Sequence, residues 1–307
     1  MMESVSFHYS SLLWLLMSFL SNLFGKGRLN YRKKYDLLQA AISGTMSQVY
    51  KARDRDTDQL VALKILDKKK TTAIEARFKG PQYKGVKKPT EGEIAMMFDH
   101  PYIVKTLDTG LTTDGEQYIV MEYLEGTGLN NVLMVQEDLM AGARVDYLRQ
   151  VAEALDVVHE KGFIHRDICP RNLLFVGDFN ILKLTDFGLS VPNKLPFTAP
   201  GNRTGTANYM APELVRRRNT DQRLDIFAFG VTAFELCTRE LPWPRGDSGN
   251  AAMTHDQPPT SIFEYRPTIN KALAKAIHAC IVPDPSKRLA DMKQFIKMIA
   301  KIEHEDQ

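Results

Sequence analysis

Three short stretches of the chain contain side chains suited to handling phosphate and metal. They are VALKIL with Lys64, HRDICPRNLL with Asp167 and Asn172, and TDFGLS with Asp186. Carboxylate and amide oxygens are ligands for hard Mg²⁺, and a lysine neutralises phosphate charge. Taken singly, Asp or Asn at such positions is normally a cap or turn residue, and Lys64 an ordinary cation of a strand. If folding brings all four together, the chemistry that they suit is phosphoryl transfer.

The order of the motifs is more specific than any one of them. HRDICPRNLL at 165–174 is followed by TDFGLS at 185–190 and YMAPE at 209–213. From about Tyr35 to Ile302 the chain resembles the eukaryotic-type (Hanks-type) serine/threonine protein kinase family. The resemblance implies an α+β, two-lobed protein kinase fold, with an antiparallel β-sheet and one helix in the N-lobe and a mainly α-helical C-lobe. It also implies transfer of the γ-phosphate of ATP to serine and threonine hydroxyls of protein substrates.

The same resemblance implies a role for each chemically suited residue. Asp167 would be the catalytic base for the acceptor hydroxyl, and Asn172 and Asp186 would hold Mg²⁺, with Mn²⁺ as a substitute. Lys64 would contact the α- and β-phosphates of ATP. Glu91, in EGEIAMMFDHPYIV, matches the helix-C glutamate that pairs with this lysine. The glutamate two residues later is expected to point elsewhere on the helix.

The nucleotide is expected to bind between the lobes. The positions implied for it are Ile42, Gly44, Val49, Ala62, Lys64, Glu91, Met121, Glu122, Tyr123 and Leu174. The glycine-rich loop departs from the family pattern G-x-G-x-x-G, because Ile42 and Ser47 replace the outer glycines and only Gly44 remains. Since glycines let backbone amides approach phosphate closely, weaker nucleotide binding is expected.

A second departure lies in the catalytic loop. Serine/threonine kinases usually carry a lysine two residues after the catalytic aspartate, and here Cys169 occupies that position. Arg171 stands four residues after Asp167, where many tyrosine kinases supply the same positive charge. We therefore predict that Arg171 replaces the missing lysine and belongs to the catalytic group.

The acceptor type depends on the stretch GTANYMAPE at 205–213. It resembles serine/threonine kinases, in which a threonine at the place of Thr206 helps to orient the catalytic aspartate. Tyrosine or dual specificity remains an alternative. So does a nucleotide-binding pseudokinase scaffold, although such a protein would be expected to lack one of the four residues named first. A small-molecule kinase would not need this peptide platform.

Regulation is expected at the activation segment, residues 186–213. Arg166 matches the family position that pairs with a phosphate on this segment. Thr198 and Thr204 are the candidate phosphorylation sites, with ordinary loop threonines as the alternative. Thr206 completes the group of regulatory candidates.

The order of elements fits a strand-rich part followed by a helix-rich part. Short β-type runs cover residues 35–40, 48–52, 60–66, 103–107 and 117–122. After Gly126 the apolar spacing becomes helical. The expected organisation is an N-terminal segment at 1–34, an N-lobe at 35–122, a C-lobe at 123–302 and a tail at 303–307.

Composition agrees with a globular enzyme. The chain has 307 residues, of which 44% are hydrophobic and 25% charged, which excludes disorder, collagen and coiled coil as descriptions of the whole chain. The three cysteines, Cys169, Cys237 and Cys280, form no CxxC pair. Neither a disulfide framework nor a cysteine zinc site is predicted, which favours a reducing compartment.

The net charge of +3 is unevenly distributed. Residues 67–88, here called the lysine-rich segment, carry eight basic residues against two acidic ones, and residues 1–35 carry five against one. Lys64 and Glu91 are 27 residues apart, more than is usual in the family. The segment is interpreted as a solvated loop, with a membrane-surface or acidic-partner site as the alternative. Nucleic acid is not an expected partner, because no aromatic stacking pattern accompanies the charge.

The apolar run at 12–24, LLWLLMSFLSNLF, is too short to span a membrane, because a helix of this length would be ~20 Å long. Together with the basic residues that follow, it predicts contact of residues 11–34 with an anionic membrane surface. A helix packed on the folded body and a start assigned too far upstream are the alternatives. The expected location is the cytoplasm, peripheral to the cytoplasmic face of a membrane, and the oligomeric state is left open.

Overall fold

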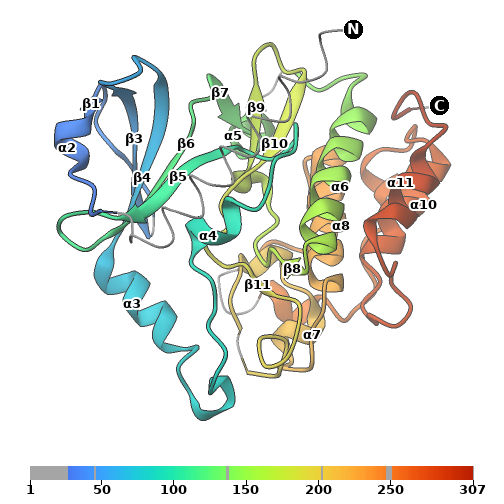
Figure 1. The fold of residues 1–307 in the computed structure, drawn as a ribbon. Helices are drawn as coiled ribbons and strands as arrows, with labels where there is room; N and C mark the ends of the chain where they lie inside the picture. The colour runs from blue at the N-terminus through green and yellow to red at the C-terminus, as the bar shows by residue number, and fades with distance from the viewer. Residues whose placement is uncertain (1–26, 45, 136–137, 202, 247–250, 307) are drawn as a thin grey trace, which may run out of the picture.

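The chain folds into two lobes, shown in Figure 1. The structure is a computed structural model that describes residues 27–44, 46–135, 138–201, 203–246 and 251–306. The side chains of residues 42, 43 and 251 also lie outside this description. An antiparallel sheet dominates the first lobe and helices dominate the second, which confirms the predicted α+β kinase fold, although the first lobe has three α-helices where one was predicted.

The small lobe is built on one antiparallel sheet. Its strands are β1 (Tyr35–Leu37), β2 (Ile42–Ser43), β3 (Ser47–Asp54), β4 (Leu60–Leu66), β5 (Thr106–Leu111) and β6 (Gln117–Glu122). They run in the order β1-β3-β4-β6-β5, and β2 pairs with β3. Leu63 and Ile65 of β4 are buried in a core that includes Tyr31 and Tyr118. The sheet therefore holds the middle of β4, and Lys64 with it, rigidly in place.

Two helices and a 3-10 turn lie between β4 and β5 in the sequence. They are α3 (Lys68–Ala76), η1 (Pro81–Tyr83) and α4 (Glu91–Ala95). Asp67 caps α3 by accepting from the backbone N–H of Lys70 at 2.9 Å. In Figure 1, α3 and the chain after it extend from the small lobe toward the region of β11 and α7. The interpretation of the lysine-rich segment as a solvated loop is wrong in this respect, because the segment forms helix and packs on the large lobe.

The large lobe surrounds a buried central helix, α8 (Arg223–Thr238). Fourteen consecutive residues of α8, from Leu224 to Cys237, are buried, so this helix is apolar on nearly all sides. The other helices of this lobe are α5 (Leu129–Met134), α6 (Arg144–Glu160), α7 (Pro212–Val215), α9 (Ile262–Tyr265), α10 (Lys271–Cys280) and α11 (Met292–Ile299).

Short strands of the large lobe carry the loops with the predicted chemistry. They are β7 (Gly126–Gly128), β8 (Phe163–Ile164), β9 (Leu173–Val176), β10 (Ile181–Leu184) and β11 (Val191–Pro192). The 3-10 turns are η2 (Pro170–Asn172), η3 (Ala207–Tyr209) and η4 (Ala251–Thr254). Strand β9 pairs with β7 and β10, and β8 pairs with β11. Residues 165–172 follow β8, and residues 185–190 connect β10 to β11.

Besides small shifts at the ends of β1 and β3, three predicted boundaries differ from the structure. The apolar run 103–107 was expected to be a strand, but Ile103 makes only an isolated bridge to Leu184, and β5 begins at Thr106. At the C-terminal end, Glu305 is buried and pairs with Arg144 at 2.9 Å, so residues 303–306 are anchored on the large lobe instead of forming a tail.

The third difference concerns the N-terminal segment. The helix α2 (Tyr31–Lys34) packs on the sheet through Tyr31, and Leu29 forms a bridge to Thr112, so residues 29–34 are part of the small lobe. Residues 1–26, including the apolar run 12–24, lie outside the described residues. Among the helices that the structure does describe, none combines the length and apolar character needed to cross a membrane.

Candidate active site

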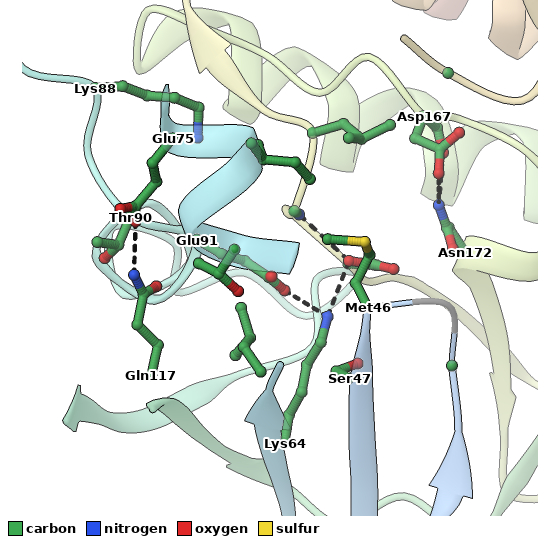
Figure 2. Close-up of a pocket in the computed structure, with 18 of the residues that line it drawn as sticks. Met46, Ser47, Lys64, Glu75, Lys88, Thr90, Glu91, Gln117, Asp167 and Asn172 are labelled. Carbon is green, nitrogen blue, oxygen red and sulfur yellow. Dashed lines mark hydrogen bonds and ion pairs between the residues drawn. The ribbon is translucent and has the colours of Figure 1, made fainter. Parts of the chain in front are cut away.

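Lys64 of β4 lies at the centre of a three-residue ion cluster. Its Nζ is 2.6 Å from Oε1 of Glu91 and 3.0 Å from Oδ1 of Asp186, as Figure 2 shows for the labelled pair. The lysine is only 8% exposed. Burial lowers the pKa of Lys64, but the two carboxylates more than offset this effect, and the net pKa is raised. The ammonium is therefore charged and points into the cleft.

Helix α4 determines which glutamate meets the lysine. Thr90 caps the helix by accepting from the N–H of Glu93 at 3.2 Å, and the Glu93 carboxylate accepts from the N–H of Thr90 at 2.7 Å. This capping box uses Glu93 and leaves Glu91, the first residue of the helix, to face Lys64. Gly92 lets α4 approach β5 closely, because a Cβ there would lie 1.9 Å from Oγ1 of Thr109.

Aromatic packing fixes the position of Asp186. The ring of Phe187 stacks on Phe98 with 4.9 Å between the ring centroids and lies edge-on to His165 at 5.0 Å. Asp186 itself has a φ of 67°, a left-handed conformation that a non-glycine residue adopts only when its surroundings impose it. The positive charge of Lys64 holds the pKa of Asp186 below its usual range.

Asp167 is oriented by a hydrogen bond at each carboxylate oxygen. Its Oδ1 accepts from the Thr206 hydroxyl at 2.7 Å and from the Thr206 N–H at 3.0 Å. Its Oδ2 accepts from Nδ2 of Asn172 at 3.0 Å, the contact drawn in Figure 2. The same amide group also donates to the backbone oxygen of Asp167 at 2.7 Å. The aspartate, the asparagine and the threonine thus form one connected group.

The catalytic loop is anchored to the central helix through Asp225 of α8. This fully buried carboxylate accepts from the N–H groups of His165 and Arg166, both at 2.7 Å, and lies 3.0 Å from Nε2 of His159. Burial raises the pKa of Asp225, but these partners outweigh it and the net pKa is lowered. The anchor holds Arg166 at a φ of 70°, immediately before Asp167.

The two unusual residues of the catalytic loop have different environments. Arg171 lines the cleft and donates from Nη2 to the Thr206 hydroxyl at 3.0 Å. Cys169 is 1% exposed, and burial raises the pKa of its thiol to about 11. Arg171 therefore places a cation beside Asp167, whereas Cys169 is a neutral, buried side chain.

A cavity of about 460 Å³ joins these groups. Eight residues expected at the site line it, namely Gly44, Lys64, Glu91, Asp167, Arg171, Asn172, Asp186 and Thr206. Figure 2 shows Lys64 reaching up from its strand beside Glu91, with Asp167 and Asn172 across the cavity. Side chains far apart in the sequence thus face one space between the lobes.

The remaining nucleotide-contact candidates do not line this cavity. They are Val49, Ala62, Met121, Glu122, Tyr123 and Leu174, while the side chain of Ile42 lies outside the described residues. Two of them have other contacts: Glu122 pairs with Lys183 at 2.6 Å, and Lys51 lies over the Tyr123 ring at 4.3 Å.

The regulatory candidates also lie outside the cavity, except for Thr206. Thr198 and Thr204 are half-buried in the activation segment, and the backbone oxygen of Thr198 accepts from the N–H of Thr220 at 3.0 Å. Arg166 is 7% exposed, and burial lowers the pKa of its guanidinium.

Part of the cavity wall comes from residues that were not named as site candidates, although Ser47, Gly188, Leu189 and Gly205 stand in the quoted motifs. They are Met46, Ser47, Leu66, Thr71, Ile74, Glu75, Lys88, Pro89, Thr90, Gln117, Gly188, Leu189 and Gly205. Glu75 of α3 accepts from Nε2 of Gln117 on β6 at 2.6 Å, which ties the lysine-rich segment to the sheet (Figure 2). For the wall residues of the lysine-rich segment, the signal in the sequence was the unusual length between Lys64 and Glu91.

The donor set fits a divalent metal held partly by the protein. Asn172 donates its amide N–H groups to Asp167, so its Oδ1 is the atom left to accept, and Asp186 supplies carboxylate oxygen. Within the described ranges, no group of three or more His, Cys, Asp and Glu side chains could hold a metal by itself. Two oxygen donors without an all-protein cage suit Mg²⁺, which keeps water and phosphate ligands.

Comparison with known proteins agrees with this geometry. Residues 37–299 match the model of the protein kinase domain family. A "Probable serine/threonine-protein kinase" of Clostridium perfringens is 33% identical over 277 residues, which cover 88% of this chain and 38% of that protein. PrkC, a serine/threonine-protein kinase of Bacillus subtilis, is 30% identical, covering 86% of this chain and 40% of the relative. The Aurora kinase of Saccharomyces cerevisiae is 36% identical over 65% of this chain and 52% of the yeast protein. The chain thus spans less than half the length of the two bacterial relatives.

Proposed function

Because this chain belongs to the protein kinase family, we propose that it is an active serine/threonine protein kinase that transfers the γ-phosphate of ATP to protein hydroxyls. The observation that carries the proposal is the convergence of Lys64, Asp167, Asn172 and Asp186 on one cavity. A pseudokinase scaffold is disfavoured, because all four residues are present and two of them, Lys64 and Asp186, are directly paired.

In this proposal Asp167 accepts the proton of the acceptor hydroxyl. The hydrogen bonds from Thr206 and Asn172 leave the carboxylate little freedom, which fits a base that must meet its acceptor in one geometry. Lys64, kept charged by its two carboxylates, would neutralise charge on the ATP phosphates. Glu91 would hold the lysine in place through their 2.6 Å ion pair.

Asn172 and Asp186 would hold Mg²⁺, with Mn²⁺ as a substitute. When bound, the metal would neutralise charge on the phosphate oxygens. The sequence candidates Ile42, Gly44, Val49 and Leu174 stay proposed contacts of the nucleotide. Arg171 would add the positive charge that the position of Cys169 lacks.

Serine and threonine are the proposed acceptors. Support comes from the contact of Thr206 with Asp167 and from the names of the relatives, which are serine/threonine kinases. The test is incubation of the purified chain with Mg-ATP and generic protein substrates, followed by phosphoamino-acid analysis. Phosphoserine and phosphothreonine are expected. Phosphotyrosine alone would contradict the acceptor, and ATP binding without transfer would contradict the activity.

Contact with an anionic membrane surface also stays a proposal. It rests on the sequence of residues 11–34, of which the described part includes Arg28, Arg32 and Lys33. Lys34 lies 3.6 Å from Asp54, so this cation is partly neutralised within the lobe. Co-sedimentation with anionic but not with neutral vesicles is the expected result, and equal recovery with both would contradict it.

A further inference from the structure

An aromatic cluster joins the lysine-rich segment to the activation segment. The Phe78 ring lies 5.5 Å from that of Tyr83 and 5.9 Å from that of Phe197, and the rings of Tyr83 and Phe197 are 5.5 Å apart. Phe78 and Tyr83 follow α3, whereas Phe197 lies between β11 and η3. The three rings thus close a triangle between two segments more than 100 residues apart in sequence.

The cluster is buried. Phe78 is 9% exposed and Phe197 is 3% exposed, and both belong to the main hydrophobic core, against which Tyr83 and Ile74 also pack. In a chain segment so rich in lysine, these apolar side chains are the ones that can hold it against the large lobe. The contact is therefore part of the folded core and not a casual touch between two surface loops.

Polar contacts continue from the cluster toward the active site. Nζ of Lys88 lies 5.7 Å from the centre of the Phe78 ring, and Lys88 lines the catalytic cavity. Burial lowers the pKa of Lys88, and the nearby carboxylates of Glu91 and Glu75 act against this effect. The segment therefore lines the cavity through Lys88 and contacts the activation segment through Phe78 and Tyr83.

We propose that the lysine-rich segment positions the activation segment, with Phe78 and Tyr83 as positioning residues that act through Phe197. The contact would favour the conformation in which Thr206 meets Asp167 and residues 205–213 can receive a peptide. The free energy that orders the activation segment would then come from a contact within the chain itself. This inference rests on the proposed kinase function for its kinetic consequence, but not for its structural one.

A population argument gives the kinetic consequence. If the ordered activation segment binds peptide and the released one does not, weakening the cluster multiplies the KM for peptide by the inverse of the ordered fraction. Saturating peptide restores the ordered state, so kcat is preserved. Neither Phe78 nor Phe197 lines the catalytic cavity, so the KM for ATP is also expected to stay unchanged.

The kinetic test uses Phe78→Ala, Phe197→Ala and the double variant, with Val86→Ala as the matched control. Val86 is a 36% exposed apolar residue of the same segment. Phe197→Ala removes both ring contacts between the segments and is expected to raise the KM for peptide roughly tenfold, whereas Phe78→Ala leaves the contact of Tyr83 with Phe197 and should raise it less. The double variant should raise it no more than Phe197→Ala alone, because no contact between the segments is left to lose. Val86→Ala should match the wild type. Additive effects, an unchanged KM for peptide, or a fall in kcat alone would overturn the proposal.

A second readout does not require activity. Trypsin can cleave after the exposed Lys194 and Arg203, which flank Phe197. Cleavage at these sites should be several-fold faster in Phe78→Ala than in the wild type and Val86→Ala, well below the unfolding temperature. Equal rates would overturn the proposal even if the chain proved inactive, whereas faster cleavage in an inactive chain would support it and reject the kinase function. Should Phe78→Ala not fold, Tyr83→Ala replaces it in both assays, with Tyr83→Phe expected to behave like the wild type.

Discussion

At the scale of single residues, hydrogen bonds orient the side chains that are proposed to carry out the transfer. Asp167 has both carboxylate oxygens engaged, one by Thr206 and one by Asn172. Arg171 donates to the same threonine hydroxyl that donates to Asp167. Thr206 therefore connects the proposed base with the proposed phosphate cation, and changes at either residue should affect the rate of transfer.

Replacing Thr206 with valine removes this hydroxyl and keeps the shape of the side chain. We expect kcat to fall about tenfold, since Asp167 loses its 2.7 Å donor and its orientation becomes less defined. Thr206→Ser should retain most of the activity. Steady-state kinetics of the two variants provide the measurement, and equal rates for valine and serine would show that the hydroxyl has no part in catalysis.

Arg171→Ala removes the cation that the catalytic loop places in the cavity beside Asp167. The other arginine of this loop, Arg166, is buried. If Arg171 replaces the usual lysine, kcat should fall by roughly 10²-fold, as when a charged donor to the transition state is lost. Arg171→Lys should recover part of the rate. A turnover rate unaffected by Arg171→Ala would refute this role.

At the scale of elements, α4 and its cap decide whether the Lys64 pair forms. Glu91 is the first residue of a helix of only five residues, so its position depends directly on the N-cap. The capping box of Thr90 and Glu93 fixes this end, and the close approach at Gly92 fixes the helix against β5.

Thr90→Ala removes the side-chain cap of α4. It should lower the free energy of unfolding by about 1 kcal/mol, the usual value of an N-cap. It should also raise the KM for ATP, because Glu91 would hold Lys64 less firmly. Thr90→Ser is the control and should restore both. Denaturant unfolding measures the first effect, and kinetics at varied ATP concentration measure the second. A normal KM for ATP in Thr90→Ala would show that the cap does not affect the pairing of Glu91 with Lys64.

How well elements could be predicted depended on their burial pattern. The strand predicted at 60–66 has the same bounds as β4, and that at 117–122 the same bounds as β6, because both are apolar runs at the centre of the sheet. The run 103–107 failed because Ile103 and Val104 are apolar for another reason: they pack against the strand ending at Leu184 of the large lobe. Apolar content alone does not distinguish these cases.

The parts of the site that could be foreseen are those encoded by local sequence motifs. Lys64, Asp167, Asn172 and Asp186 stand in motifs, so their convergence could be predicted. Helix α3 could not, because its sequence KKKTTAIEA has no apolar stripe and none of its residues is fully buried. Its contribution to the cavity wall comes from tertiary contacts, such as that between Glu75 and Gln117, which no local pattern encodes.

At the scale of the whole molecule, residues of both lobes line the cavity, and the core of the large lobe supports the catalytic loop. Asp225 of α8 carries this support, because it accepts two backbone N–H groups of the loop. A second buried pair, Arg288 with Glu213 at 2.7 Å, holds the end of the activation segment to the same core. Stability and activity therefore share one scaffold.

Asp225→Asn should lower the free energy of unfolding at pH 7 by about 3 kcal/mol, because a buried, hydrogen-bonded charge is replaced by an amide that cannot accept all of its bonds. The folded-state pKa of Asp225 is lowered, so its stabilising effect is present above the unfolded value of about 4 and is lost as the pH falls through the folded value. The difference between wild type and variant should therefore shrink below pH 4. Denaturant unfolding across this range is the measurement, and a difference independent of pH would argue against an ionised Asp225.

Comparing phosphate transfer by the wild type with transfer by Asp167→Asn shows whether Asp167 is the catalytic base. Both proteins should bind Mg-ATP, because Lys64 pairs with Glu91 and Asp186, whereas the Asp167 carboxylate is bonded to Thr206 and Asn172. Transfer to serine or threonine should fall by roughly 10²–10⁴-fold in the variant if Asp167 is the base. We expect this loss of transfer with the affinity for Mg-ATP retained. Equal transfer by the two proteins, or none by the wild type at saturating Mg-ATP, would contradict it.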